Sequence, residues 1–199
     1  MLLDAVVAGL VLGWVFRGRF VNLAEVEIRG VALAVLGVLL QFVRQYGASA
    51  GWPLVREWAP VFYVGTFWIL LAVIWLNRRN PAFLLIGFGI FLNMLVIAAN
   101  GGKMPVSAES LARAGFDPGP IASGQVITHQ LLTETTRLAF LADVLVLGKP
   151  YPRPVVFSIG DLLLSAGALW CLVGGMLAHP SVTRRPKPLK TRVSLPGLN

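Results

Sequence analysis

Five long apolar runs are the feature of this sequence that most restricts its fold. They are residues 2–16, 28–46, 59–76, 81–99 and 159–178, separated by charged or turn-forming residues. A helix needs roughly 20 apolar residues to cross the hydrocarbon core of a bilayer, where its backbone amides have only one another as partners. The first run is shorter, so either Arg17 and Arg19 behind it extend to the membrane surface or the bilayer thins around it. The pattern predicts an all-α fold, a polytopic membrane helix bundle with about five transmembrane helices.

The composition agrees with a membrane protein. Of the 199 residues, 56% are hydrophobic and only 13% are charged, whereas soluble domains carry about a quarter charged residues. A single cysteine, Cys171, excludes an internal disulfide framework and any cysteine pair for metal or redox chemistry. The sequence therefore predicts no metal site and identifies no cofactor.

Charge placement gives the expected orientation. If the runs alternate across the membrane, one side holds ten of the 17 Lys and Arg residues against only Glu25 and Glu27, and thus the whole net charge of +8. The positive-inside rule makes this side cytoplasmic. We expect a cell-membrane protein with an extracytoplasmic N-terminus, one transmembrane domain at 1–179 that includes an extracytoplasmic segment at 100–158, and a basic cytoplasmic tail at 180–199. The tail follows a span closely and lacks interleaved aromatic residues, so it indicates the lipid bilayer as partner and no nucleic acid.

The segment 100–158 is too polar to span a bilayer and is rich in glycine and proline. Two short helices are predicted inside it. The first runs from Ala108 to Ala114, with Ser107 as its N-cap and Gly115 as its stop. The second covers about 127–146, where leucines recur at helical spacing.

The groups best suited to chemistry lie in this segment and at the start of the last run. His129 is the only histidine there, and in a helix it would share a stripe with Arg137. This favours His129 as a general base that Asp143 or Asp161 orients. Lys103, together with Arg137, would bind a phosphate or carboxylate. A structural role for His129, exposed or capping, stays open.

The remaining polar candidates have a structural and a functional interpretation. Ser158 and Asp161 have the spacing of a capping box at the start of the last helix. Gln41 and Asn93 are polar side chains at membrane depth, which mark ligand sites but also form hydrogen bonds between helices. Asn100 opens a turn that would present backbone amides to an anion, or would simply end the fourth helix. Small residues four apart in the first and last runs predict close helix packing: Ala5, Gly9 and Gly13, and Gly167, Cys171 and Gly175.

Three segments carry a resemblance to a known family. They are NGGKMPVS, then HQLLTETTRLAFLAD, and, after a proline-rich stretch, FSIGDLLLSAG. In this order they resemble a family of uncharacterised bacterial five-span integral membrane proteins with a domain of unknown function. The resemblance covers nearly the whole chain except the basic tail. It implies a bacterial integral membrane protein, and it implies no activity, substrate or catalytic residue.

Three functions are compatible with these residues. The first is a binding or scaffold subunit of a membrane assembly, whose extracytoplasmic segment recognises a membrane-protein partner, a second copy of the chain or a lipid head group. The second is a membrane enzyme that acts at the outer leaflet on a lipid-linked or anionic substrate through His129. The third is a small transporter that works as an oligomer, with a short polar path at Gln41, Asn93 and Asn100. The small number of ionisable residues inside the runs favours the first.

Overall fold

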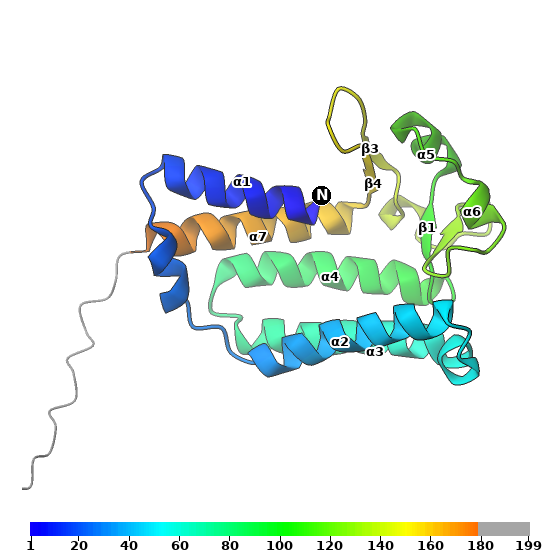
Figure 1. Ribbon diagram of the computed structural model, residues 1–199, viewed down its shortest axis with the longest axis horizontal. Coiled ribbons are helices and arrows are strands. Elements are labelled where there is room, and N and C mark those ends of the chain that lie inside the picture. The colour runs from blue at the N-terminus through cyan, green and yellow to red at the C-terminus, as the bar shows by residue number, and fades with distance from the viewer. Residues whose placement is uncertain (179–199) are drawn as a thin grey trace, which may run out of the picture.

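Five long helices dominate the protein. The structure, a computed structural model, describes residues 1–178, so the basic tail expected at 180–199 lies outside the described residues. The helices are α1 (Leu2–Val15), α2 (Val31–Ser49), α3 (Pro53–Leu76), α4 (Pro81–Ala99) and α7 (Ile159–Leu177), and they lie side by side along roughly one direction (Figure 1). Each apolar run is therefore largely helical, and α4 has the bounds of its run.

The connections between these helices alternate between the two ends of the bundle (Figure 1). One end holds the 3-10 helix η1 (Phe20–Glu25), the α3–α4 turn and the end of α7, and we call it the tail end. The opposite end holds the α2–α3 turn and residues 100–158, which we call the cap. Helices α1, α3 and α7 therefore run in one direction, and α2 and α4 run in the other.

Two helices, α4 and α7, are long and apolar enough to cross a membrane by length and composition. The apolar parts of the other three are shorter: Leu2–Val15, Val31–Val43 and Val61–Leu76. Helix α4 lies inside the bundle, because α3 packs on one side of it and α7 on the other.

Small residues permit the close packing of α7 against its neighbours. A Cβ atom added at Gly13 of α1 would lie 2.5 Å from the sulfur of Met176 in α7. A Cβ at Gly167, elsewhere on α7, would lie 2.9 Å from the carbonyl oxygen of Ala82 in α4. The packing that the small-residue spacing predicts is confirmed at these positions.

Two buried asparagines close the tail end. The Asn77 amide donates to the carbonyl oxygens of Arg29 and Val73, both at 2.8 Å, and its Oδ1 accepts from the Arg29 N–H at 2.9 Å. Asn22 donates to the carbonyl oxygens of Met176 and Ala178, both at 2.8 Å. The bonds to Val73, Met176 and Ala178 add donors to carbonyl oxygens at the C-terminal ends of α3 and α7, where a helix has no intrahelical donors left. The bonds to Arg29 tie the residues before α2 to the end of α3.

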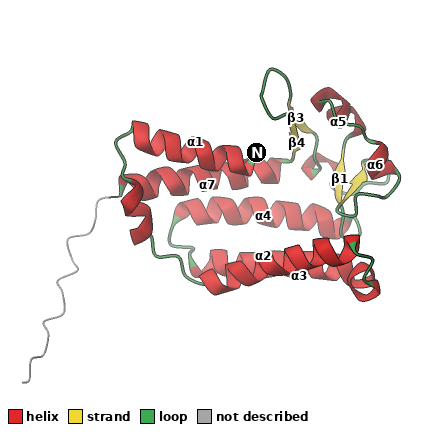
Figure 2. Cartoon of the chain, viewed as in Figure 1, coloured by secondary structure: helices red, strands yellow, loops and turns green. Residues whose placement is uncertain are grey.

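The cap contains short strands, so an all-α description holds for the bundle but not for the cap (Figure 2). Its elements are β1 (Met104–Val106) parallel to β2 (His129–Leu131), and β3 (Leu145–Leu147) antiparallel to β4 (Val155–Phe157), with α5 (Ala108–Ala114) and α6 (Gly119–Ala122) between β1 and β2. The prediction for α5 is confirmed, because Ser107 Oγ accepts from the Ser110 N–H and Gly115 ends the helix at a φ of +85°.

The helix predicted at about 127–146 is wrong. The chain forms β2, a 3-10 turn η2 (Ala139–Leu141) and β3 there. A local turn interrupts any helix, because the Thr133 N–H donates to the Thr136 hydroxyl at 2.8 Å. Leu138 then takes a left-handed φ of +54°. The leucine spacing has another cause: Leu138 and Leu141 pack on the core between α3 and α4.

Candidate functional site

His129 and Asp143 meet in the cap across the buried strand β1. One edge of β1 pairs with β2, which carries His129. The other edge binds the backbone of Asp143, whose N–H donates to the Pro105 carbonyl oxygen and whose carbonyl oxygen accepts from the Ser107 N–H. The middle position of β1 thus places both side chains within reach of each other.

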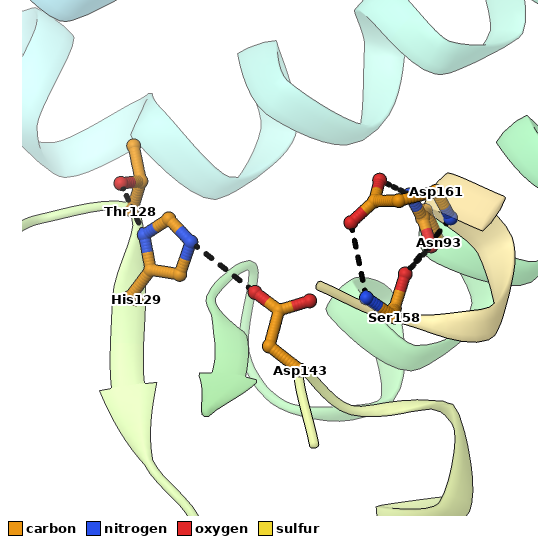
Figure 3. A network of polar contacts seen from close by, with 6 residues as sticks. All are labelled: Asn93, Thr128, His129, Asp143, Ser158 and Asp161. Carbon is orange, nitrogen blue, oxygen red and sulfur yellow. Dashed lines mark hydrogen bonds and ion pairs between the residues drawn. The ribbon is translucent and has the colours of Figure 1, made fainter. Parts of the chain in front are cut away.

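The imidazole of His129 has a neighbour at each nitrogen (Figure 3). Its Nε2 lies 3.6 Å from Oδ2 of Asp143, and its Nδ1 forms a hydrogen bond of 2.8 Å with the Thr128 hydroxyl. The Asp143 side chain is only 9% exposed, and its Oδ1 has no hydrogen-bond partner among residues 1–178. The three side chains form a chain in the order hydroxyl, imidazole and carboxylate.

The electrostatic setting of Asp143 opposes its negative charge. Burial raises the pKa of Asp143 above its ordinary value, because a charged carboxylate loses its hydration there. The nearby imidazole of His129 works against this rise in the pKa, and the negative charge of Asp161 adds to it. His129 is therefore the neighbour that favours ionised Asp143.

A second polar cluster joins the start of α7 to α4 (Figure 3). Ser158 Oγ accepts from the Asp161 N–H at 3.0 Å, and Asp161 Oδ2 accepts from the Ser158 N–H at 3.2 Å. The predicted capping box is therefore confirmed. The side chain of Asn93 closes the cluster, since it donates to Asp161 Oδ1 at 2.7 Å and accepts from Ser158 Oγ at 2.9 Å.

Asn100 attaches the cap to the end of α4. Its amide donates to the carbonyl oxygens of Val96 and Arg137, and its Oδ1 accepts from the Arg137 N–H at 3.0 Å. The predicted stripe shared by His129 and Arg137 is wrong, because no helix joins them. Within the described chain, no hydrogen bond or ion pair links the exposed Arg137 guanidinium to His129.

Two predicted binding residues lie outside these clusters. Gln41 donates to the Thr66 hydroxyl at 2.8 Å and so joins α2 to α3. Lys103 is half-buried in the turn between α4 and β1. The structure thus brings His129, Asp143, Asp161 and Asn93 into one region and leaves Gln41 in a contact between helices.

Sequence reasoning missed Thr128, which completes the hydroxyl, imidazole and carboxylate chain. Its position next to the only histidine of the segment is the one signal that could have indicated it. The order of the three groups is that of a catalytic triad, in which the imidazole takes a proton from the hydroxyl. Within residues 1–178, no group of three His, Cys, Asp or Glu side chains is placed to hold a metal ion.

Comparison with known proteins places this capped helical bundle in a family. Residues 25–173 match the family of unknown function DUF5317, and the chain belongs to this family. An uncharacterised protein of Thermotoga maritima is 29% identical to it over 167 residues, which are 84% of this chain and 87% of that protein. No solved structure matches the chain. The predicted membership of an uncharacterised family is confirmed, and the family description names no activity.

Proposed function

We propose that the chain is a five-span integral membrane protein of the cell membrane, with the cap outside and the tail end in the cytoplasm. The exposed surface of the bundle supports this. Phe42, Trp68 and Trp170 lie in different helices and are each at least half exposed. A soluble monomer rarely exposes a contiguous apolar area beyond a few hundred Å². A bilayer would cover these side chains.

Charge at the tail end supports the orientation. Arginines gather at its turns, where Glu25 and Glu27 are the acidic residues: Arg17, Arg19, Arg29, Arg78 and Arg79. The guanidinium of Arg78 lies 4.5 Å from the ring centre of Trp75, a pair suited to the membrane–water boundary.

Single-cysteine labelling tests this topology. Cys171→Ala removes the one native thiol, and Ser123→Cys or Glu27→Cys then adds one in the cap or at the tail end, where both positions are exposed. A membrane-impermeant maleimide on intact cells should label only the Ser123→Cys chain, and the Glu27→Cys chain should react only after the cells are opened. Equal or reversed labelling would contradict the proposal.

For the cap, we propose a binding or scaffold role in a membrane assembly. The observation that carries this is the closed set of hydrogen bonds of Asn93, Asn100, Ser158 and Asp161, which hold the cap on α4 and α7. A fixed platform suits recognition, because little ordering is needed on binding. The platform exposes Phe116 and Phe140, at 48% and 66%, which suit contact with a protein partner.

Site-specific crosslinking in the native host tests this role. A photoreactive amino acid replaces Phe140 in one chain and Phe116 in another, and Ser123, exposed in the same cap, serves as the control position. A binding role predicts one adduct of defined mass from a phenylalanine position and none from position 123. Identical adduct patterns at all three positions would contradict it.

A membrane enzyme is the second candidate, favoured by the chain of Thr128, His129 and Asp143. In such an enzyme the Thr128 oxygen would attack a carbonyl carbon while its proton passes to Nδ1 of His129. A fluorophosphonate probe tests this directly. Under our proposal, the wild-type protein and Thr128→Val stay equally unlabelled; an adduct on Thr128 that the variant lacks would establish the enzyme. Transport has less support, because Gln41, Asn93 and Asn100 bind neighbouring segments.

A further inference from the structure

An apolar groove runs between α1 and α7 below the β3–β4 hairpin. It encloses about 390 Å³, within the range of about 300–1,000 Å³ that is common for small-molecule sites. One face of α7 lines it with residues at helical spacing, including Leu162, Ser165, Ala166 and Leu169. Ala5 and Ala8 of α1 form the opposite wall, and their small side chains leave the space open.

The Ser165 hydroxyl is an unusual feature of this groove. The residue is 4% exposed, and its hydroxyl has no hydrogen-bond partner among residues 1–178. A buried hydroxyl without a partner is unfavourable, because it has lost its bonds with water. A ligand with an acceptor oxygen at this depth would remove that penalty.

Charged groups lie at the cap end of the groove. Asp4 of α1 lines it and forms an ion pair with Arg153, which belongs to the loop between β3 and β4. Arg153 is 59% exposed, so its guanidinium is accessible to a further anion. Tyr151 of the same loop also lines the groove.

These groups follow a definite order along α7. Ser165 is six residues beyond Ile159, which places it about 9 Å into the helix at 1.5 Å per residue. Leu169 lies one further turn along. From the cap end inward, a ligand would therefore meet the ion pair of Asp4 and Arg153, then a hydroxyl donor, then an apolar wall.

We propose that the groove holds one acyl chain of an outer-leaflet phospholipid. The lipid phosphate binds Arg153, an ester carbonyl oxygen accepts a hydrogen bond from Ser165, and the acyl chain lies along Ala166 and Leu169. This inference rests on the proposed membrane topology, because the groove must lie in the outer half of the bilayer. The order of the groups, an exposed guanidinium, a hydroxyl and an apolar wall, matches a phospholipid, whose phosphate, ester and chain come in this order.

Photocrosslinking with a defined lipid tests the proposal. The full-length protein is placed in vesicles that contain phosphatidylglycerol with a diazirine in one acyl chain, and adducts are mapped by mass spectrometry after irradiation. We expect adducts to concentrate on the residues of α1 and α7 that line the groove. Adducts spread evenly over the exposed faces of α2, α3 and α4 would overturn the proposal.

Matched variants distinguish lipid binding in the groove from non-specific contact with the bilayer. Ala166→Phe fills the groove, whereas Ala72→Phe places the same side chain on an exposed part of α3. We expect Ala166→Phe to reduce the groove adduct at least fivefold and Ala72→Phe to leave it unchanged. Arg153→Gln should reduce it about threefold, against no change for Arg113→Gln on α5, which is also exposed. Equal yields within either pair would overturn the site.

Native mass spectrometry of protein extracted in mild detergent identifies the natural occupant. A retained phospholipid that is lost in Ala166→Phe supports the proposal. A retained isoprenyl phosphate, or a lipid without phosphate, would overturn this choice of occupant. The cysteine labelling described above distinguishes the two failures: correct labelling without groove adducts rejects only the lipid site, whereas reversed labelling rejects the topology itself.

Discussion

The two ends of the bundle are closed by similar residues with different chemistry. At the tail end, Asn22 and Asn77 bind only backbone groups. At the cap end, Asn93 binds Asp161, in the same region as the pair formed by His129 and Asp143 (Figure 3). The closure of the tail end by these two asparagines therefore does not depend on pH, whereas the closure at the cap end includes groups that titrate.

The largest effect is expected from Gly160→Ala at the cap end. The added Cβ atom would lie 2.0 Å from Oδ1 of Asn93 and 2.8 Å from the carbonyl oxygen of Gly89. Because backbone cannot move aside easily, α7 must shift away from α4 and the polar cluster must open. We expect a loss of about 3 kcal/mol in the free energy of unfolding, measured by SDS titration in mixed micelles. Unchanged stability would show that the cluster does not close this end.

The next effect is expected from Asn77→Leu at the tail end. The variant keeps a similar volume but leaves the N–H and carbonyl of Arg29 and the carbonyl of Val73 without their side-chain partner. The Val73 carbonyl keeps its bond from the backbone N–H of residue 77, so the two Arg29 groups are the ones left unpaired. We expect a loss of about 2 kcal/mol in the free energy of unfolding, since leaving a buried group unpaired costs about 1–3 kcal/mol and these groups are partly buried. Asn80→Ala, which removes one bond to the Ala82 N–H in the neighbouring turn, should lose about half as much. If Asn77→Leu lost no more stability than Asn80→Ala, the hydrogen bonds of Asn77 would not be what holds the tail end together.

Sequence reasoning succeeded where the determinants are local. The apolar run 81–99 gave the bounds of α4, and Ser107 and Gly115 gave those of α5. It failed at 127–146, because β2 forms by pairing with β1, some 25 residues earlier in the chain. The same non-local pairing brings His129 to Asp143. The sequence therefore indicated His129 and left open whether Asp143 or Asp161 was its partner. It did not indicate that Thr128 binds the other side of the imidazole. Periodicity reports which faces are apolar, and it does not report which neighbour each face meets.

The effect of pH on stability should differ between substitutions at the two ends of the bundle. The pKa of Asp143 is higher in the native state than in the unfolded state, where an aspartate has a pKa of about 3.9. Between these two pKa values the native state therefore binds more protons than the unfolded state. Its stability therefore falls as the pH rises through the window up to the native pKa. Asp143→Asn does not titrate, so the melting temperature of the variant minus that of the wild type should increase with pH across this window. Thermal unfolding at a series of pH values measures it.

The tail end supplies the control for that measurement. Asn77 binds only backbone groups, so the difference in melting temperature between Asn77→Leu and the wild type should be the same at each pH. A difference for Asp143→Asn that stays constant, or that decreases as the pH rises, would show that the carboxyl of Asp143 is not disfavoured in the folded cap.

The smallest effect is expected from Gly65→Ala, which is also the control for Gly160→Ala. Gly65 lies within α3, and a Cβ atom added there would meet nothing within 4 Å. Because glycine in a helix loses more backbone entropy than alanine on folding, Gly65→Ala should raise the free energy of unfolding by about 0.5–1 kcal/mol. The same substitution therefore has opposite signs at two helix positions, because the new methyl group meets neighbouring atoms at Gly160 and open space at Gly65. SDS titration of both variants against the wild type checks this. A loss at Gly65 would show that the space beside this face of α3 is filled in the folded protein and not open.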